Sequence, residues 1–245
     1  MKAVVFGATG GVGHQVVEAL AKNDAWETVV LVLRKETSDF DDIEGGKKVT
    51  KIFLQNFDDI SSLEGEFQGF DALFCTMAAY MKDDGLDAIK KVDLDYTVAS
   101  ADLAQKSGIS SFSLLTMPND ADIPESATGW QGYKRIKGLA EKAVLERLRS
   151  SSRPDGIKFI YIYKPGIIFG RGAAKGKDSI RSKGSWDTFT DVFKCCCCCL
   201  KNGAGIDARR IALVMASVAE TRGGFVGEDG GTVQIDNAMM HKYKL

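Results

Sequence analysis

The sequence predicts an α/β fold with a doubly wound, mostly parallel sheet, and two observations carry that prediction. Short apolar runs rich in Val, Ile and Phe alternate with longer segments of helical period, as expected for strands that are covered on both faces. The first run is followed at once by a glycine-rich turn and an amphipathic segment. With 245 residues, the chain is long enough for one such domain spanning residues 1–245.

Seven apolar runs are predicted to be the strands. They lie at 2–6, 28–33, 50–54, 71–75, 111–115, 158–163 and 232–235. The predicted helices between them lie at 11–22, 85–107, 130–149 and 207–220. Within 85–107, apolar residues recur at spacings of three and four, which predicts one buried helical face. That face comprises Leu86, Ile89, Val92, Tyr96, Ala99 and Leu103.

Residues 171–206 form the least regular segment of the sequence, with a Gly-, Lys- and Ser-rich start. Such a composition is typical of a loop rather than of a packed element. Ligands of doubly wound folds bind outside the carboxyl ends of the strands, where long loops lie. We therefore interpret this small C-terminal region either as a substrate flap or as a flexible insertion.

Composition excludes several classes of function. A net charge of −1 argues against a broad binding surface for nucleic acid. No apolar run approaches the roughly 20 residues of a transmembrane segment. Because an apparent strand begins at Lys2, we expect no signal or transit peptide, and a cytoplasmic location, with the nucleus as the alternative.

Five of the six cysteines, Cys195 to Cys199, are consecutive. This block lacks the paired spacing of zinc ligands, so we predict no metal site. Lipid attachment, redox or soft-metal chemistry, and no function at all remain open interpretations of the block.

The turn after the first strand contains glycines at Gly7, Gly10 and Gly13. A tight turn and the close approach of a pyrophosphate both require residues without Cβ, and a helix N-terminus supplies free N–H groups. A strand before this turn and a helix after it predict a dinucleotide site. At the end of the second strand, Arg34 and Lys35 come before any acidic residue, which favours NADPH and makes NADH the weaker candidate.

Tyr133 and Lys137 lie one helical turn apart in the predicted helix 130–149. Chance often produces this spacing, so its meaning depends on the surrounding motifs. Both residues fall on the stripe expected to face the sheet, where burying an ammonium is costly unless its charge is used. A cation beside a tyrosine lowers the tyrosine pKa from its usual value of about 10, which suits a general acid for carbonyl reduction.

Together with KPGIIFG (164–170), these motifs resemble the short-chain dehydrogenases/reductases of the Rossmann-type fold. More narrowly, QNFDD (55–59), VDLDY (92–96) and FSLLTM (112–117) are similar to the atypical branch that contains the Tat-interacting oxidoreductase. The resemblance covers nearly the whole chain and weakens over 171–206. It implies a set of cofactor-binding positions: Gly7, Thr9, Gly10, Gly11, Val12, Gly13, Arg34, Lys35, Asn56, Phe57, Thr76, Met77, Ala78, Tyr133, Lys137, Pro165 and Ile167.

The resemblance also assigns catalytic roles. It implies that Tyr133 is the proton donor, that Lys137 binds the nicotinamide ribose and lowers the tyrosine pKa, and that Thr116 polarises the substrate carbonyl. The family usually has a serine pair where this chain has Thr116 and Met117, and a thioether cannot donate a hydrogen bond. Asn56 likewise stands where aspartate is common.

Two hypotheses follow. The first is an NADPH-dependent oxidoreductase that reduces a small carbonyl compound. The second is an NADPH-binding regulatory or adaptor protein with little turnover, which contacts a protein partner through 171–206. A sugar-nucleotide epimerase is less favoured, because few residues follow the sixth strand to build a substrate domain.

Overall fold

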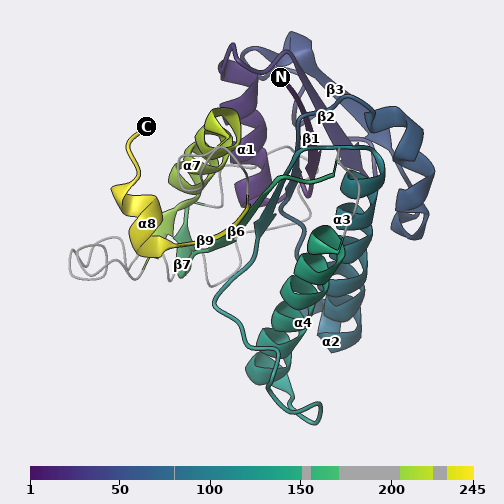
Figure 1. Ribbon diagram of the computed structural model, residues 1–245, viewed down its shortest axis with the longest axis vertical. Helices are drawn as coiled ribbons and strands as arrows, with labels where there is room; N and C mark the ends of the chain where they lie inside the picture. The colour runs from purple at the N-terminus through teal and green to yellow at the C-terminus, as the bar shows by residue number, and fades with distance from the viewer. Residues whose placement is uncertain (80, 151–155, 171–204, 223–230) are drawn as a thin grey trace.

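The computed structural model describes residues 1–79, 81–150, 156–170, 205–222 and 231–245 (Figure 1). Its main sheet has seven strands in the order β3-β2-β1-β4-β5-β6-β9, and every neighbouring pair is parallel. The strands are β1 (Lys2–Phe6), β2 (Thr28–Leu33), β3 (Val49–Phe53), β4 (Ala72–Cys75), β5 (Ser111–Leu115), β6 (Phe159–Lys164) and β9 (Gly231–Asp236). The predicted Rossmann-type α/β fold is confirmed.

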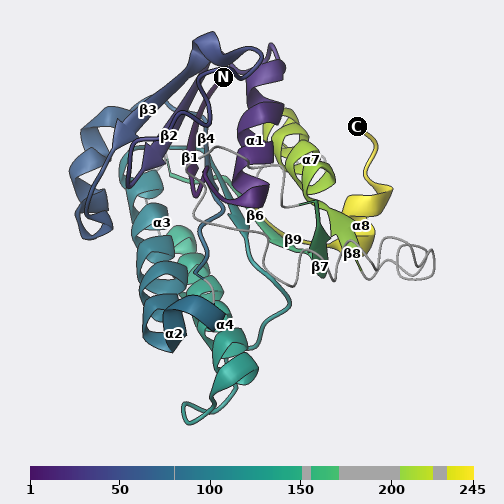
Figure 2. The ribbon, with the colours of Figure 1, turned by 180° about the vertical axis from the view of Figure 1, so that it is seen from behind.

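Helices cover both faces of the sheet (Figures 1 and 2). One face carries α1 (Gly11–Lys22), α7 (Ala208–Thr221) and α8 (Asn237–Lys242), and the other carries the 3-10 helix η2 (Phe57–Phe67), α3 (Thr97–Lys106) and α4 (Gly129–Arg149). Alternate residues of β6 show the division, because Tyr161 packs in the α1/α7 core while Ile162 packs with α4. The smaller elements are a short 3-10 turn, η1 (Gly46–Lys48), and a two-stranded sheet of β7 (Ile167–Phe169) and β8 (Gly205–Asp207).

The predicted helix 85–107 is in fact three elements. These are α2 (Met81–Ile89), a π-helix η3 (Lys90–Tyr96) and α3. A π-helix adds a residue per turn, so the buried face after Ile89 shifts relative to a 3.6-residue period. As a result Asp93 and Thr97 are buried, whereas the expected core residues Val92 and Tyr96 are only partly buried.

From β1 the chain adds β2 and β3 on one side of the sheet and then returns to add β4 on the other side of β1. The direction in which strands are added therefore reverses between β1 and β4. Ligands of such sheets bind where this reversal occurs, outside the carboxyl ends of the strands. The residues that follow β1, β4, β5 and β6 therefore meet at one edge of the sheet. Of the segment 171–206, residues 171–204 lie outside the described residues, as does the cysteine block, while Gly205 and Ile206 belong to β8.

No helix in the described part of the chain combines the length and the apolarity needed to cross a membrane.

Candidate functional site

The turn between β1 and α1 has no room for a side chain at Gly7, and the first turn of α1 has none at Gly13. Gly7 has a φ of 80°, in the left-handed region, and a Cβ there would lie 2.7 Å from the Met77 amide nitrogen. A Cβ on Gly13 would lie 2.1 Å from the Gly7 carbonyl oxygen. The Gly10 N–H donates to that same oxygen at 2.9 Å, which closes the turn. The sequence predicted these glycines correctly as a tight turn.

Helix α1 begins directly after this turn. Its N-cap is Gly10, which has no side chain to accept from the free N–H groups, and its first turn contains no acidic residue. Val12 is buried against the sheet while Thr9 is exposed. Uncapped N–H groups at the positive end of the helix dipole attract an anion.

The loop after β4 is fastened to the glycine turn. The Thr76 hydroxyl donates to the carbonyl oxygens of Phe6 at 2.9 Å and of Gly7 at 3.2 Å. Met77 is buried beside it, and Ala78 is exposed. Three predicted cofactor positions thus line the sheet edge next to the turn.

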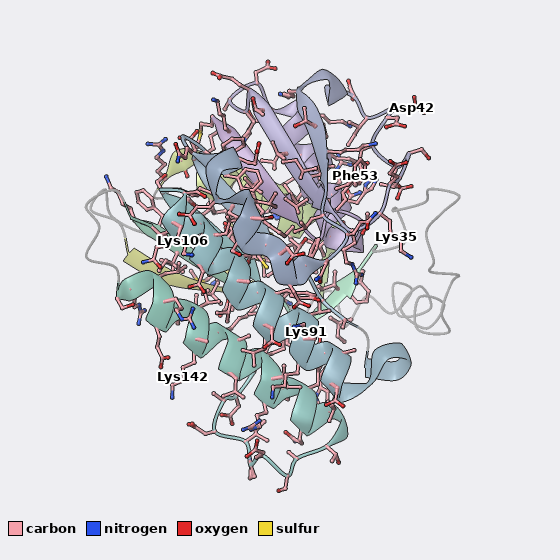
Figure 3. The ribbon with its side chains drawn as sticks, turned by 90° about the vertical axis from the view of Figure 1, so that its right-hand side faces the viewer. Lys35, Asp42, Phe53, Lys91, Lys106 and Lys142 are labelled. Carbon is pink, nitrogen blue, oxygen red and sulfur yellow. The ribbon has the colours of Figure 1, made fainter. Side chains whose placement is uncertain are left out.

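Three further predicted positions follow the outer strands β2 and β3. Arg34 and Lys35 follow β2 and are exposed, and Lys35 projects from the surface just past the strand end (Figure 3). The Asn56 side chain accepts from the Asp58 N–H at 3.1 Å and so caps η2.

Phe57 is a core residue in this structure. Its ring contacts the rings of Phe6 and Tyr96 edge to face, with centroids 5.9 and 5.7 Å away. Only 6% of the residue is exposed. The contact of Phe57 with the adenine stays a prediction. Because the ring is buried, only the backbone of Phe57 is available for that contact.

Tyr133 and Lys137 lie on successive turns of α4, as predicted. The Lys137 Nζ lies 5.7 Å from the centroid of the Tyr133 ring, within the range of a cation–π contact. On the same stretch of helix, the exposed Trp130 ring lies 5.6 Å from the Tyr133 ring. Tyr133 is partly buried and Lys137 is 6% exposed, so the expected inward stripe is present.

Asp93 is the residue of this site that the sequence interpretation missed. Its carboxylate forms an ion pair with the Lys137 ammonium, and both side chains are almost fully buried. The other carboxylate oxygen accepts from the Ala79 N–H at 2.8 Å, which ties the loop after β4 to the same pair. Burial by itself would lower the pKa of Lys137, but Asp93 and then Tyr133 outweigh it and raise that pKa above 10.5.

The remaining predicted positions follow β5 and β6. Thr116 is buried at the end of β5, and its N–H donates to the Tyr163 carbonyl oxygen at 2.9 Å. Pro165 follows β6 and is buried. Ile167 is different, because it belongs to the small β7–β8 sheet and is 54% exposed.

A family model described as NAD(P)H-binding matches residues 7–164, which is more than half of the chain. The chain belongs to this NAD(P)H-binding family. The match begins at Gly7, in the glycine turn, and ends at Lys164, the last residue of β6. It therefore starts just after β1 and includes the strands from β2 to β6.

Two relatives are similar to much of the chain. The chain is 26% identical over 166 residues to Protein HTATIP2 of Rattus norvegicus, a match that covers 67% of this chain and 61% of that protein. Thus less than two thirds of the rat protein is matched. The UPF0659 protein YMR090W of Saccharomyces cerevisiae is 25% identical over 189 residues, covering 76% of this chain and 79% of that protein.

Solved structures show the same fold at lower identity. A short-chain dehydrogenase/reductase from Serratia marcescens superposes with a TM-score of 0.66 and 16% identity, covering 98% of this chain and 97% of its own. A UDP-glucuronic acid 4-epimerase from Bacillus cereus, solved with NAD, gives 0.66 and 14% identity, covering 96% and 78%. The resemblance to atypical short-chain dehydrogenases/reductases is confirmed.

The geometry of the glycine turn suits the pyrophosphate of a nicotinamide cofactor. The space that a Cβ would occupy at Gly7 and Gly13 is closed to side chains, while the N–H groups that open α1 have no side-chain acceptor from their N-cap. A pyrophosphate needs this combination of bare backbone and free donors.

Proposed function

We propose that the protein is an NADPH-dependent reductase of small carbonyl compounds, in which residues 1–245 act as one cofactor-binding domain. The observation that carries the proposal is the buried Lys137 beneath the Tyr133 ring, held through Asp93 to the loop after β4. A buried ammonium costs free energy, and a neighbouring phenol is the group that benefits from its charge.

The residues of the site divide between cofactor binding and proton transfer. The glycine turn and the N-terminus of α1 hold the pyrophosphate, and Lys137 holds the nicotinamide ribose. Bound NADPH supplies the hydride that is transferred to the carbonyl carbon. Tyr133 donates its proton to the carbonyl oxygen, so that the product is an alcohol, and the ammonium of Lys137 stabilises the phenolate left behind. The Thr116 hydroxyl donates a hydrogen bond to the same oxygen.

Removal of the phenol tests this chemistry. Wild type and Tyr133→Phe are compared on a panel of aldehydes, ketones and quinones, with NADPH oxidation as the measurement. We expect kcat to fall by about 100-fold or more, because a general acid contributes that much, while the Kd for NADPH changes little. Tyr243→Phe is the matched control, since Tyr243 hydrogen bonds to Ser217 on α7. Equal rates for wild type and Tyr133→Phe would contradict the assignment.

The choice of NADPH over NADH is tested at Arg34. Its exposed guanidinium follows β2, where it would pair with the 2′-phosphate of NADPH. In a fluorescence titration, Arg34→Ala is expected to weaken NADPH binding by about 10-fold, or about 1.4 kcal/mol, with NADH binding unchanged. Equal affinity of the wild type for both cofactors would remove this role from Arg34.

An NADPH-binding regulator without turnover is the second candidate. Met117 in place of a hydroxyl favours it, and so does the Asp93 carboxylate, which already balances the charge of Lys137. In this case NADPH binds, no carbonyl compound of the panel is reduced, and saturating NADPH protects 171–206, the proposed partner-binding segment, from protease. Digestion that NADPH does not alter would argue against it.

A further inference from the structure

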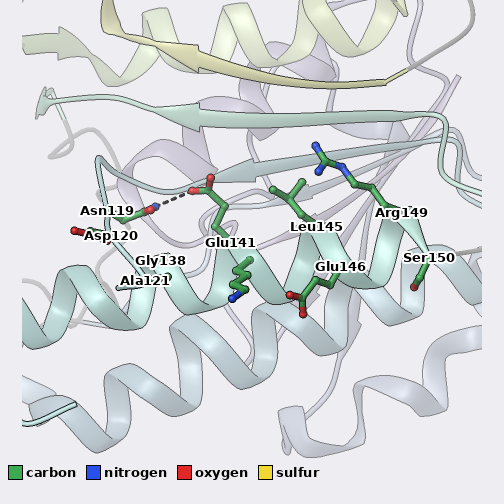
Figure 4. A pocket seen from close by; sticks show the side chains of 10 residues that line it. Asn119, Asp120, Ala121, Gly138, Glu141, Leu145, Glu146, Arg149 and Ser150 are labelled. Carbon is green, nitrogen blue, oxygen red and sulfur yellow. Dashed lines mark hydrogen bonds between the residues drawn. The ribbon is translucent and has the colours of Figure 1, made fainter. Parts of the chain in front are cut away.

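A second buried polar cluster lies on α4, close to the Tyr133–Lys137 pair in the sequence. Its centre is Glu141, which is 6% exposed and lies one helical turn beyond Lys137. One carboxylate oxygen accepts from the Asn119 side-chain N–H at 2.8 Å (Figure 4). The other lies 2.8 Å from the Lys164 ammonium and accepts from the Gln234 side chain at 3.1 Å. Glu141 thus joins α4 to the segments at the ends of β5, β6 and β9.

The cluster borders a groove of about 830 Å³ beside α4, with Asn119 at one end and Arg149 and Ser150 at the other (Figure 4). Gly138 lets the chain after β5 lie directly on the helix, because a Cβ at Gly138 would be 2.3 Å from the Ala121 amide nitrogen. The Asn119–Glu141 hydrogen bond therefore forms where the backbone of the chain after β5 already contacts α4.

Asn119 connects this cluster to the predicted substrate-contacting hydroxyl. Its side-chain nitrogen donates to the Met117 carbonyl oxygen at 2.9 Å and lies 3.4 Å from the Thr116 hydroxyl oxygen. The two hydrogens of this amide are directed to Met117 and Glu141, so the longer contact with Thr116 is a shared, three-centre one, and the hydroxyl proton of Thr116 is left to donate to another acceptor. Met117 supplies no donor of its own, so the orientation of Thr116 depends on the turn that Asn119 holds.

We propose that Asn119 and Glu141 are positioning residues that fix Thr116 relative to Tyr133. This inference rests on the proposed function, because the phenol and the hydroxyl must reach one carbonyl oxygen from two different elements, α4 and the end of β5. The Asn119–Glu141 bond spans those two elements. Lys164 balances the charge of Glu141, so the carboxylate can stay buried without an unpaired charge.

The test combines a structural and a kinetic measurement on the full chain. Asn119→Ala removes the bridge, and Glu141→Gln is a second, nearly isosteric variant that removes the charge. Glu146→Ala is the control, because Glu146 lines the same groove and is exposed. The measurements are hydrogen–deuterium exchange over residues 116–121, the Kd for NADPH, and kcat in a double-mutant cycle with Thr116→Ala.

We expect faster exchange over 116–121 in both variants and an unchanged Kd for NADPH. For Asn119→Ala, kcat should fall by about 10-fold, since small misplacements of reacting groups are costly. In the Thr116→Ala background the same change should cost nothing further, because Asn119 acts through that hydroxyl. A general structural role would instead lower kcat equally in both backgrounds.

Two results overturn the inference: unchanged exchange over 116–121 in Asn119→Ala, or additive losses in the cycle. Failure of the proposed function looks different. If the wild type binds NADPH but reduces no carbonyl compound, the proposed reaction and the catalytic part of this inference both fail. The exchange measurement then still decides whether Asn119 and Glu141 order the turn.

Discussion

Replacing Asp93 with alanine is expected to lower the free energy of unfolding by about 3–5 kcal/mol, the usual cost of leaving one charge of a buried ion pair without its partner. Lys137 would lose its carboxylate, and the Ala79 N–H would lose its acceptor. Chemical denaturation at neutral pH measures the effect.

Because Asp93 raises the pKa of Lys137, the lysine contributes its full stabilisation below pH 10.5 and loses it only as the pH rises through the raised value.

The matched control for this change is Asp95→Ala. Asp95 lies in the same π-helix but is exposed, and its oxygen is 3.9 Å from the Lys91 ammonium. A surface pair of this kind is worth less than about 1 kcal/mol.

A double variant, Asp93→Leu with Lys137→Met, should recover most of the lost stability, because an apolar pair of similar size removes both buried charges. It should not recover reductase activity, since Lys137 is absent. If Asp93→Ala is as stable as Asp95→Ala, the ion pair does not have the stabilising role assigned to it.

Gly13→Ala is expected to abolish measurable NADPH binding and to destabilise the fold by about 3 kcal/mol, at the upper end of what overpacking costs. The added Cβ would lie 2.1 Å from the Gly7 carbonyl oxygen and 2.7 Å from the Thr76 hydroxyl. The first of these contacts is with backbone, which cannot rotate away. Relief requires α1 to move from β1, and that movement displaces the N–H groups that would receive the pyrophosphate.

The control is Gly65→Ala, at a position in η2 where a Cβ would meet nothing within 4 Å. That variant should bind NADPH like the wild type and have similar stability. Binding is measured by fluorescence titration and stability by thermal unfolding. Normal NADPH binding by Gly13→Ala would show that the cofactor does not depend on the close packing of this turn.

The glycine turn and the Tyr133–Lys137 pair could be predicted from the sequence because each depends on neighbouring residues. Gly7, Gly10 and Gly13 define one turn, and a spacing of four places two side chains on one helical face whatever the rest of the fold does. The parallel sheet followed from the alternation of buried strands and helices.

Asp93 could not be found in the same way, because its burial depends on the π-helical winding of residues 90–96. A period of 3.6 residues places Val92 and Tyr96 inward instead. The cluster around Glu141 was missed for another reason: its partners Asn119, Lys164 and Gln234 come from three separate segments, and no local pattern connects them. Phe57 likewise joins the core through tertiary contacts.

Helix α4 fixes the spacing of three side chains of this site. Tyr133, Lys137 and Glu141 are four residues apart, so they are spaced by about 6 Å along the helix axis. An insertion or deletion in the loop before Gly129 moves all three together and leaves their mutual spacing intact. A single residue inserted between Tyr133 and Glu141 would instead turn part of the row by about 100°. The chain can thus vary the length of the loop that leads into α4 while keeping the phenol, the ammonium and the carboxylate in register.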